Sequence, residues 1–297
     1  MSARSMPRDG RYALELDDVY FEVDPSAGGR VTSYRIGGVD VLSGSDVDPD
    51  NYGSTFWTSP QSDWGWPPPS ELDRAPYAIA SDGDTLTLIG PRCDSLGIRV
   101  TKQFSVDRIK GAIVLKYAIH NESQTPRRYA PWEVTRVRSR GLTFFPTNAR
   151  SSGPLRVERL GPAAWFAHNP DVLTATGEKA LAHSHPGILA HAAQRYLYVK
   201  SFANVAPELR APGEGEVEIY ANNRYVEAEV QGPYATIEPG ASTSWSVAWY
   251  LRRLPHHIVA FPGNAELLAF ATSVVRPSLP PAAAFHAVTG PTPHSPG

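Results

Sequence analysis

Apolar and polar residues alternate along most of the chain, and this two-residue period predicts β-strands. Segments with this alternation are 12–16, 19–23, 30–36, 39–42, 85–89, 98–106, 112–120, 129–137, 142–145, 156–160, 196–202, 217–220, 225–230 and 243–251. Asp17-Asp18 and Gly37-Gly38 each separate two such segments by two residues, which is typical of a tight hairpin turn. The pattern therefore predicts an all-β, antiparallel protein.

One segment has the spacing of a helix instead. Apolar residues of 265–275 recur at helical intervals, with Asn264 before them as N-cap and Pro277 after them as stop. We expect a flexible N-terminus (1–10), a single domain (11–276) and a disordered Pro-rich tail (277–297). Two segments lack a period: 51–76 is predicted to be a long loop, and 175–193 is either a loop or a poor helix.

Composition narrows the class of protein. The 297 residues carry a net charge of -2, which argues against bulk attraction to nucleic acid. A single cysteine, Cys93, excludes an intramolecular disulfide and a Cys-rich zinc site. No apolar run is long enough to predict a membrane span, and no secretory leader is recognisable. We expect a cytoplasmic protein that binds a small molecule, with neither nucleic acid nor membrane as partner; its oligomeric state stays open.

The segment 51–69 is rich in tryptophan and proline, and it supplies four candidate ligand-binding residues: Trp57, Gln61, Trp64 and Trp66. Indole faces stack on the apolar face of a sugar ring, and an amide bonds its hydroxyl groups. The alternative is a structural plug that covers an open end of the sheets. A long aromatic segment on an all-β scaffold suggests a ligand cleft beside a sheet.

A second group of candidates lies in the predicted strand 129–137. Its alternation places Trp132 and Arg136 on one face and Glu133 on the other. Charged residues inside an apolar strand are costly unless they are paired or belong to a site. Trp132 and Arg136 are candidates for ligand binding and Glu133 for catalysis; the alternative is a structural ion pair.

A third group lies in the segment 225–231, where Glu227, Glu229 and Gln231 share a face and Tyr225 begins the strand. Carboxylates two residues apart on a strand are about 7 Å apart, so their repulsion raises a pKa and favours acid–base chemistry. Glu227 and Glu229 are therefore candidate catalytic groups, and Tyr225 and Gln231 candidate binding groups. The alternative is the solvated face of an edge strand.

Histidines add little to this interpretation. His183, His185 and His191 have no nearby carboxylate pattern, so polarity of a loop explains them better than a metal site. No phosphate-binding glycine loop, nucleophile elbow or zinc-protease motif occurs. We predict no metal and no cofactor.

Several motifs together resemble the galactose mutarotase-like (aldose 1-epimerase-like) superfamily. The segment from Gly53 to Pro68 reads G-x-x-F-W-x-S-P-Q-x-x-W-x-W-P-P, similar to a signature of one bacterial branch of that superfamily. The Gly28-Gly29 opening, the Tyr117-to-Asn121 strand and the Ile237-to-Gly240 turn occur in the superfamily's order. The resemblance covers about 12–255 and implies a large antiparallel β-supersandwich, here with one C-terminal helix.

The resemblance also implies roles for the carboxylates. Aldose 1-epimerases use a late Glu in an E-x-Q pattern as base, which Glu229-Val230-Gln231 matches, and a mid-chain His as acid, which is missing here. Glu133 stands about where that His would be. The implied function is cofactor-independent proton transfer at the anomeric centre of a sugar or sugar derivative. The alternatives are a non-catalytic carbohydrate-binding domain, or a recruited lyase- or cyclase-type enzyme acting on a glycosylated or polycyclic metabolite.

Overall fold

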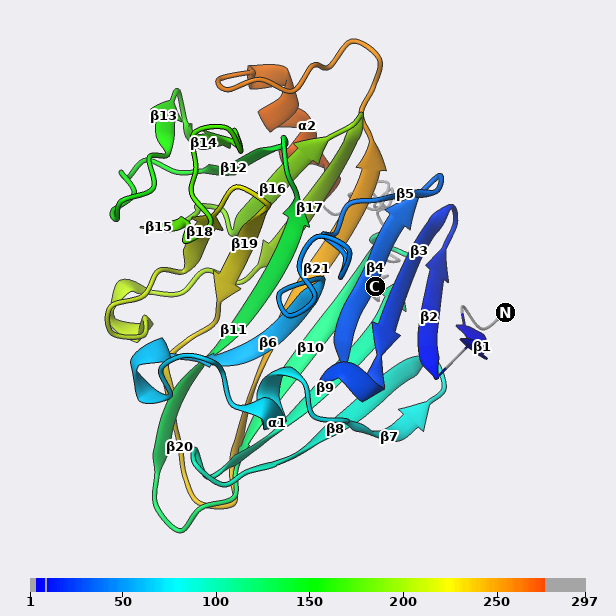
Figure 1. The fold of residues 1–297 in the computed structure, drawn as a ribbon, viewed down its shortest axis with the longest axis vertical. Coiled ribbons are helices and arrows are strands. Elements are labelled where there is room, and N and C mark those ends of the chain that lie inside the picture. The colour runs from blue at the N-terminus through cyan, green and yellow to red at the C-terminus, as the bar shows by residue number, and fades with distance from the viewer. Residues whose placement is uncertain (1–3, 9, 276–297) are drawn as a thin grey trace, which may run out of the picture.

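Two antiparallel β-sheets pack face to face in the computed structural model, which describes residues 4–8 and 10–275 (Figure 1). The first sheet runs in the order β1 (Arg4–Arg8), β2 (Arg11–Leu16), β3 (Val19–Asp24), β4 (Arg30–Ile36), β6 (Ser54–Ser59), β11 (Arg127–Arg138), β19 (Tyr225–Gln231), β18 (Val217–Ala221) and β15 (Glu178–Ala182), with β5 (Val39–Asp40) on β4 and β20 (Ala235–Ile237) on β11. The second runs in the order β13 (Glu158–Leu160), β14 (Ala163–Ala167), β12 (Leu142–Pro146), β16 (Ile188–Ala193), β17 (Tyr196–Phe202), β21 (Ser242–Arg253), β10 (Ala112–Asn121), β9 (Ile98–Asp107), β8 (Thr85–Cys93) and β7 (Ala78–Asp82). The predicted all-β fold class is confirmed.

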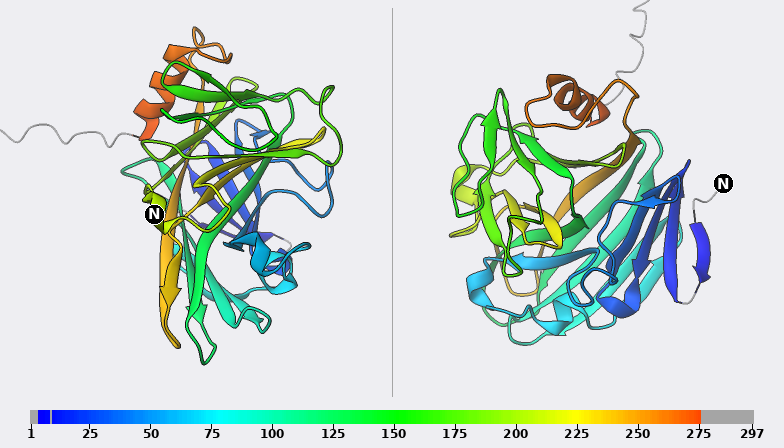
Figure 2. Two further views of the ribbon diagram at one scale, coloured as in Figure 1. Left: turned by 90° about the vertical axis from the view of Figure 1, so that its left-hand side faces the viewer. Right: turned by 45° about the horizontal axis from the view of Figure 1, so that its top comes forward.

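Helices are few and short within the described residues. They are α1 (Ser70–Asp73), α2 (Ala265–Val275) and the single turns η1 (Pro25–Ala27), η2 (Gln61–Asp63) and η3 (Pro207–Leu209). The helix α2 has the predicted bounds, and the Asn264 side chain caps its first turn by accepting from the backbone N–H of Glu266 and of Leu267. It packs on the second sheet near β17 (Figure 2). Its Leu267 and Ala271 side chains are buried.

The hairpins follow the predicted turn chemistry. Gly37 and Gly38 both have positive φ, as a two-residue turn of type I′ requires, and Ile36 pairs with Val39 across it. Leu16 pairs with Val19 in the same way around the other predicted turn.

Three segments differ from the sequence expectation. The segment 51–76, predicted as a loop, contains β6, and 175–193 contains β15 and β16. Residues 4–8, predicted to be flexible, form β1 on the edge of the first sheet. The predicted Pro-rich tail lies outside the described residues.

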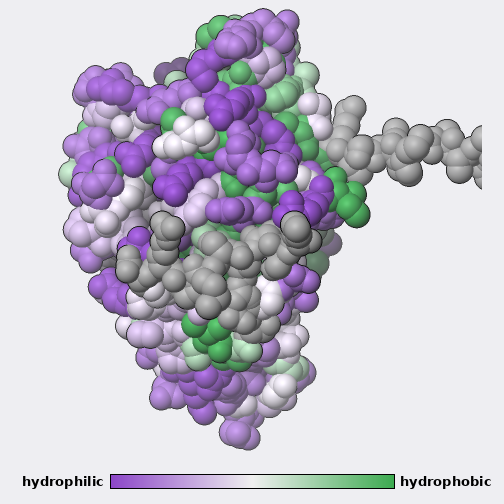
Figure 3. Space-filling view, turned by 90° about the vertical axis from the view of Figure 1, so that its right-hand side faces the viewer, coloured by the Kyte–Doolittle hydropathy of each residue, from purple (hydrophilic) through white to green (hydrophobic). Residues whose placement is uncertain are grey.

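The core lies between the two sheets. Phe21 of β3 packs edge to face on Tyr34 of β4 and on Trp249 of β21, and the Tyr34 and Trp249 rings are tilted against each other. The ring centroids lie 5.4–5.8 Å apart, and none of the three residues exposes more than 1% of its surface. The side of the molecule near β1 and β7 is mainly hydrophilic, with small hydrophobic patches (Figure 3). Among the described residues, no helix has the length and apolarity to cross a membrane.

The register of three central strands positions the candidate residues. Strand β11 lies between β6 and β19, and Trp132 pairs with Trp57 on one side and Gln231 on the other. Arg136 pairs with Glu227. Because paired residues project from the same face of a sheet, one face of β6, β11 and β19 gathers the aromatic and charged candidates.

Candidate functional site

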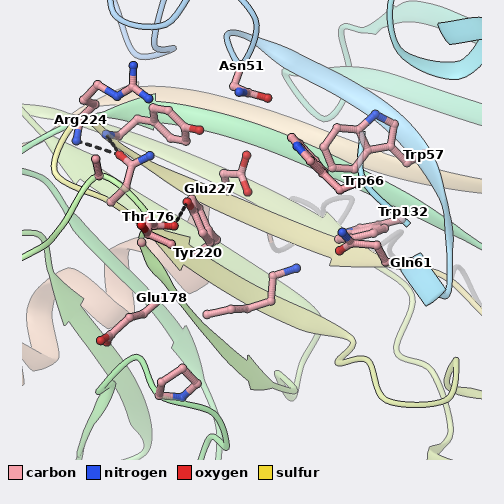
Figure 4. A pocket seen from close by; sticks show the side chains of 16 residues that line it. Asn51, Trp57, Gln61, Trp66, Trp132, Thr176, Glu178, Tyr220, Arg224 and Glu227 are labelled. Atoms are coloured by element: carbon pink, nitrogen blue, oxygen red, sulfur yellow. Dashed lines mark hydrogen bonds between the residues drawn. The ribbon is translucent and has the colours of Figure 1, made fainter. Parts of the chain in front are cut away.

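A cleft of about 570 Å³ opens over β6, β11, β18 and β19 on the face of the first sheet that carries Trp132. Trp57, Trp66, Trp132 and Gln61 line one side, and Thr176, Tyr220 and Arg224 the other, with Glu227 between them (Figure 4). The three tryptophans form an aromatic wall, and Thr176, Tyr220 and Arg224 form a polar wall opposite, with the Glu227 carboxylate between the two. We call this cavity the aromatic cleft.

The aromatic wall is built from two strands, β6 and β11, and from the segment that follows η2. The Trp57 ring of β6 meets Trp132 of β11 edge to face at 5.4 Å and Trp66, which follows η2, at 6.0 Å. Trp66 is 61% exposed, so its indole face is open to a ligand. Trp64, predicted to bind ligand, does not line the cleft: it packs against Trp57 and Trp132 and donates to the carbonyl of Thr58. Its role there is to support the wall.

The floor of the cleft contains a buried ion pair. Arg136 Nε donates to Glu227 Oε1 at 2.7 Å, and the guanidinium lies 5.1 Å from the Trp57 ring centre. Burial opposes the positive charge, but Glu227 and Asp73 outweigh it and raise the pKa of Arg136. Arg136 is fully buried beneath the cleft, whereas the Glu227 side chain keeps 11% of its surface exposed. Glu227 is therefore the half of the pair that a ligand can reach.

A lysine held by buried carboxylates forms the second charged group. Lys179 of β15 lines the cleft and places Nζ 2.7 Å from Glu218 Oε2 and 3.4 Å from Glu229 Oε2. Glu229 Oε2 also accepts from Trp132 Nε1 at 2.7 Å. Burial raises the pKa of Glu229 to about 7, and it raises the pKa of Glu218 as well. The carboxylates in turn hold Lys179 protonated, since they raise its pKa in spite of its burial.

Two predicted residues lie behind this lysine and not in the cleft. Glu229 is fully buried and does not line the cavity. Gln231 is also buried, and its amide donates to Glu218 Oε1 at 2.9 Å. Glu229 holds the indole of Trp132, and Gln231 holds Glu218, which pairs with Lys179. Both residues therefore influence a ligand indirectly, by positioning Trp132 and Lys179.

Glu133 is on the opposite face of β11, as the alternation predicts, and there it points into the core. Its carboxylate accepts from Trp249 Nε1 at 2.9 Å and from the Tyr117 hydroxyl at 2.8 Å, and it pairs with Lys200 Nζ at 2.9 Å. The structure therefore does not bring Glu133 and Glu229 to one cleft, because adjacent positions on a strand point to opposite sides of the sheet. The expectation that Glu133 is the acid opposite Glu229 is corrected: Glu133 belongs to a structural ion pair.

The polar wall contains residues that the sequence did not indicate. Asn222 Oδ1 accepts from the backbone N–H of Arg224 and of Tyr225, which shapes the turn between β18 and β19. The Tyr220 hydroxyl donates to the carbonyl of Thr176. Tyr225 lines the cleft as expected, and burial raises the pKa of its hydroxyl. The Asn222-Asn223 turn between two strands was the signal in the sequence for this wall.

None of the three histidines His183, His185 and His191 lines the aromatic cleft. His191 is buried, its Nδ1 is 2.9 Å from the Thr143 hydroxyl, and burial lowers its pKa to about 3. Within residues 4–8 and 10–275, no three His, Cys, Asp or Glu side chains come together as metal ligands would.

The two-sheet architecture is similar to that of galactose mutarotase-like proteins of known structure. A galactose mutarotase-like protein from Lactobacillus casei ATCC 334 matches with a TM-score of 0.59 at 10% identity, over 82% of this chain and 100% of that one. A galactose mutarotase related enzyme from Lactobacillus acidophilus matches with a TM-score of 0.58 at 7% identity, over 84% and 100%. No family model and no curated protein matches the sequence.

A TPR-domain containing protein from Parabacteroides distasonis ATCC 8503 shares the fold at a TM-score of 0.60 and 15% identity, over 86% of this chain. This chain spans 49% of that protein, so about half of it lies outside the similarity. These similarities establish the galactose mutarotase-like fold that the motifs predicted. At such identities they concern the fold, and the activity has to be argued from the cleft.

Proposed function

We propose that the aromatic cleft binds a carbohydrate. The observation that carries this proposal is the exposed face of Trp66 beside Trp57 and Trp132, across a cavity from hydrogen-bonding side chains. A pyranose has an apolar C–H face and a rim of hydroxyl groups, and the cleft offers a matching surface for each. The similarity of the fold to galactose mutarotase-like proteins supports the same class of ligand.

The polar groups of the cleft suit neutral hydroxyl groups. Glu227 has Oε1 occupied by Arg136, which leaves Oε2 to accept from a ligand hydroxyl. Lys179 keeps 28% of its side chain exposed and donates from the other end of the floor. A donor and an acceptor fixed by buried partners lose little entropy when a hydroxylated ring binds between them.

Truncation of the exposed indole tests this proposal. We expect Trp66→Ala to weaken sugar binding about fivefold or more, because removing an aromatic anchor costs more than about 1 kcal/mol. Binding would be measured by NMR line broadening over a panel of aldoses, uronic acids and glycosylated metabolites. The matched control is Phe261→Ala, which removes another exposed aromatic residue outside the cleft. Equal affinities for both variants and the wild type would reject the aromatic cleft as the sugar site.

Proton transfer at the anomeric carbon is the second candidate function. It is favoured by one observation: Glu227 and Lys179, an acceptor and a protonated donor, both line the cleft. Glu227 would take the proton of the anomeric hydroxyl while Lys179 Nζ gives one to the ring oxygen. The ring C–O bond then breaks as the carbonyl forms, and reversal on the other carbonyl face yields the other anomer.

Exchange NMR tests this second function. Glu227→Gln keeps an oxygen for Arg136 but removes the base, so we expect anomer exchange to slow at least about 10²-fold while binding is kept. Glu229→Gln is the comparison, because Glu229 is the base that family resemblance implies although it lies beneath Trp132. Loss of exchange in Glu229→Gln alone would assign the base to Glu229. Binding without exchange in the wild type would leave a carbohydrate-binding domain.

A further inference from the structure

A second cavity adjoins the aromatic cleft. It has a volume of about 280 Å³, and Arg138, Arg140, Arg224, Ser139 and Gln194 are among its lining residues. Arg224 lines both cavities, so the two are neighbours across a single side chain. We call the second one the arginine cavity.

Strand β11 connects the two cavities. Trp132, Arg136 and Arg138 are spaced by even numbers along it and therefore project from the same face. Trp132 and Arg138 are six residues apart, roughly 20 Å at the rise of a strand. Tyr225, which lines the cleft, pairs with Arg138 in register. One face of β11 thus leads from the aromatic wall to the guanidinium groups.

Two of the three arginine side chains are only weakly paired with carboxylates of the chain. Arg138 lies 3.9 Å from Asp46 and Arg140 lies 3.5 Å from Asp171, and each of these side chains is at least 41% exposed. Such exposed pairs contribute about 0–1 kcal/mol, so a ligand can displace them. Arg224 holds a closer partner, Asp48, at 2.8 Å.

Asp40, which also lines the arginine cavity, is hydrogen-bonded to other groups of the protein. Asp40 accepts from the Ser33 hydroxyl at 2.6 Å and from the backbone N–H of Tyr34 and of Leu42 at 3.1 and 3.0 Å. The carboxylate keeps its charge, but these donors occupy three of its acceptor positions, so it is not free to pair with the arginine side chains. Arg140, by contrast, is held by its backbone: it has φ of 62° and its N–H donates to His168 Nδ1 at 3.0 Å. This fixes the base of the arginine side chain, while the exposed guanidinium is held only by the weak pair with Asp171.

We propose that the arginine cavity is an anion subsite of the aromatic cleft, so that the ligand is a sugar bearing a carboxylate or phosphate group beyond the stacked ring. The proposal rests on carbohydrate binding in the cleft. Guanidinium groups bind both kinds of oxyanion through paired N–H donors. The carboxylate would come from an acidic oligosaccharide and the phosphate from a glycosyl phosphate.

Calorimetric titration of the full chain with matched probes tests the subsite. The pairs are digalacturonate against neutral galactobiose, and galactosyl phosphate against galactose; inorganic phosphate alone probes the subsite without a sugar. We expect the acidic member of at least one pair to bind about tenfold more tightly, as a charge-assisted hydrogen bond of about 1.5 kcal/mol implies. The preferred pair tells a carboxylate ligand from a phosphate ligand. The preference should fade at about 1 M salt, where the Debye length is about 3 Å.

Variants distinguish the failure of each proposal. Arg138→Gln, and Arg140→Asn at the left-handed position that asparagine tolerates, should abolish the acidic preference and leave neutral binding within about twofold, well inside the effect of one charged hydrogen bond. The control Arg92→Gln changes an exposed arginine of β8 that is paired with Asp94, and it should leave all affinities unchanged. Neutral binding that needs Trp66, with no acidic advantage, overturns the subsite alone. Phosphate binding that needs Arg138, without any sugar binding, overturns the sugar proposal and leaves the arginine cavity as an anion site that serves no sugar. Binding of no probe overturns both.

Discussion

Replacing Glu133 by alanine is expected to lower the free energy of unfolding by about 3–5 kcal/mol, because it leaves the buried charge of Lys200 without a counter-ion. Lys200 is fully buried, and burial already lowers its pKa in the presence of Glu133. The indole N–H of Trp249 and the hydroxyl of Tyr117 would lose their acceptor at the same time. Urea denaturation followed by tryptophan fluorescence measures the loss.

The control for Glu133→Ala is Glu238→Ala, which removes an exposed carboxylate from the loop before β21. We expect that variant to stay within about 0.5 kcal/mol of the wild type. A double variant, Glu133→Leu with Lys200→Met, should recover much of the lost stability because no unpaired charge is left. If Glu133→Ala were as stable as the wild type but lacked activity, Glu133 would have a catalytic role and its placement in the core would be wrong.

Replacing Lys179 by methionine is expected to destabilise the protein in a pH-dependent way. Burial raises the folded-state pKa of Glu229 to about 7, above its unfolded value, so protonation favours folding. The stability that Glu229 contributes is present below its unfolded pKa and is lost as the pH rises through about 7. Lys179 limits this loss, since its charge lowers the pKa of both Glu229 and Glu218.

Without that charge, the stability of Lys179→Met should fall more steeply with pH. We expect a loss of about 3 kcal/mol or more at pH 8, the cost of breaking a buried ion pair, and a much smaller loss at pH 5. Denaturation curves at both pH values measure the difference. The matched control is Lys116→Met, at an exposed position of β10, which should change stability little at either pH. An equal loss at both pH values would contradict the assignment of the charges.

The central strands could be predicted because the residues that alternate in their sequences also alternate between the two faces of the sheet. It placed Trp132 and Arg136 opposite Glu133 on β11, and the register confirms that division. The same period failed for β6, because polar pairs on both sides of Phe56-Trp57, Ser54-Thr55 and Thr58-Ser59, interrupt the alternation. The aromatic segment was therefore predicted to be a loop although its tryptophan wall begins on a strand.

The charged floor could be predicted only in part. Glu227 and Arg136 were recognised as candidates, and they meet as cross-strand partners. Lys179 was missed because its carboxylates come from residues 39 and 50 positions later in the chain, and no local pattern encodes such a contact. Its own strand, β15, lies in a segment without a recognisable period.

The ion pairs of Arg136 with Glu227 and of Glu133 with Lys200 lie on opposite faces of β11, and together they favour one register of this strand. A slip of one residue would turn Glu133 toward the tryptophan wall and bury Arg136 against the aromatic core, away from Glu227. Each misplaced charge would then be buried without its partner. The shifted register would therefore be destabilised on both faces of the sheet. Polar residues that look costly in the middle of this strand thereby discriminate the native pairing from its nearest competitors during folding.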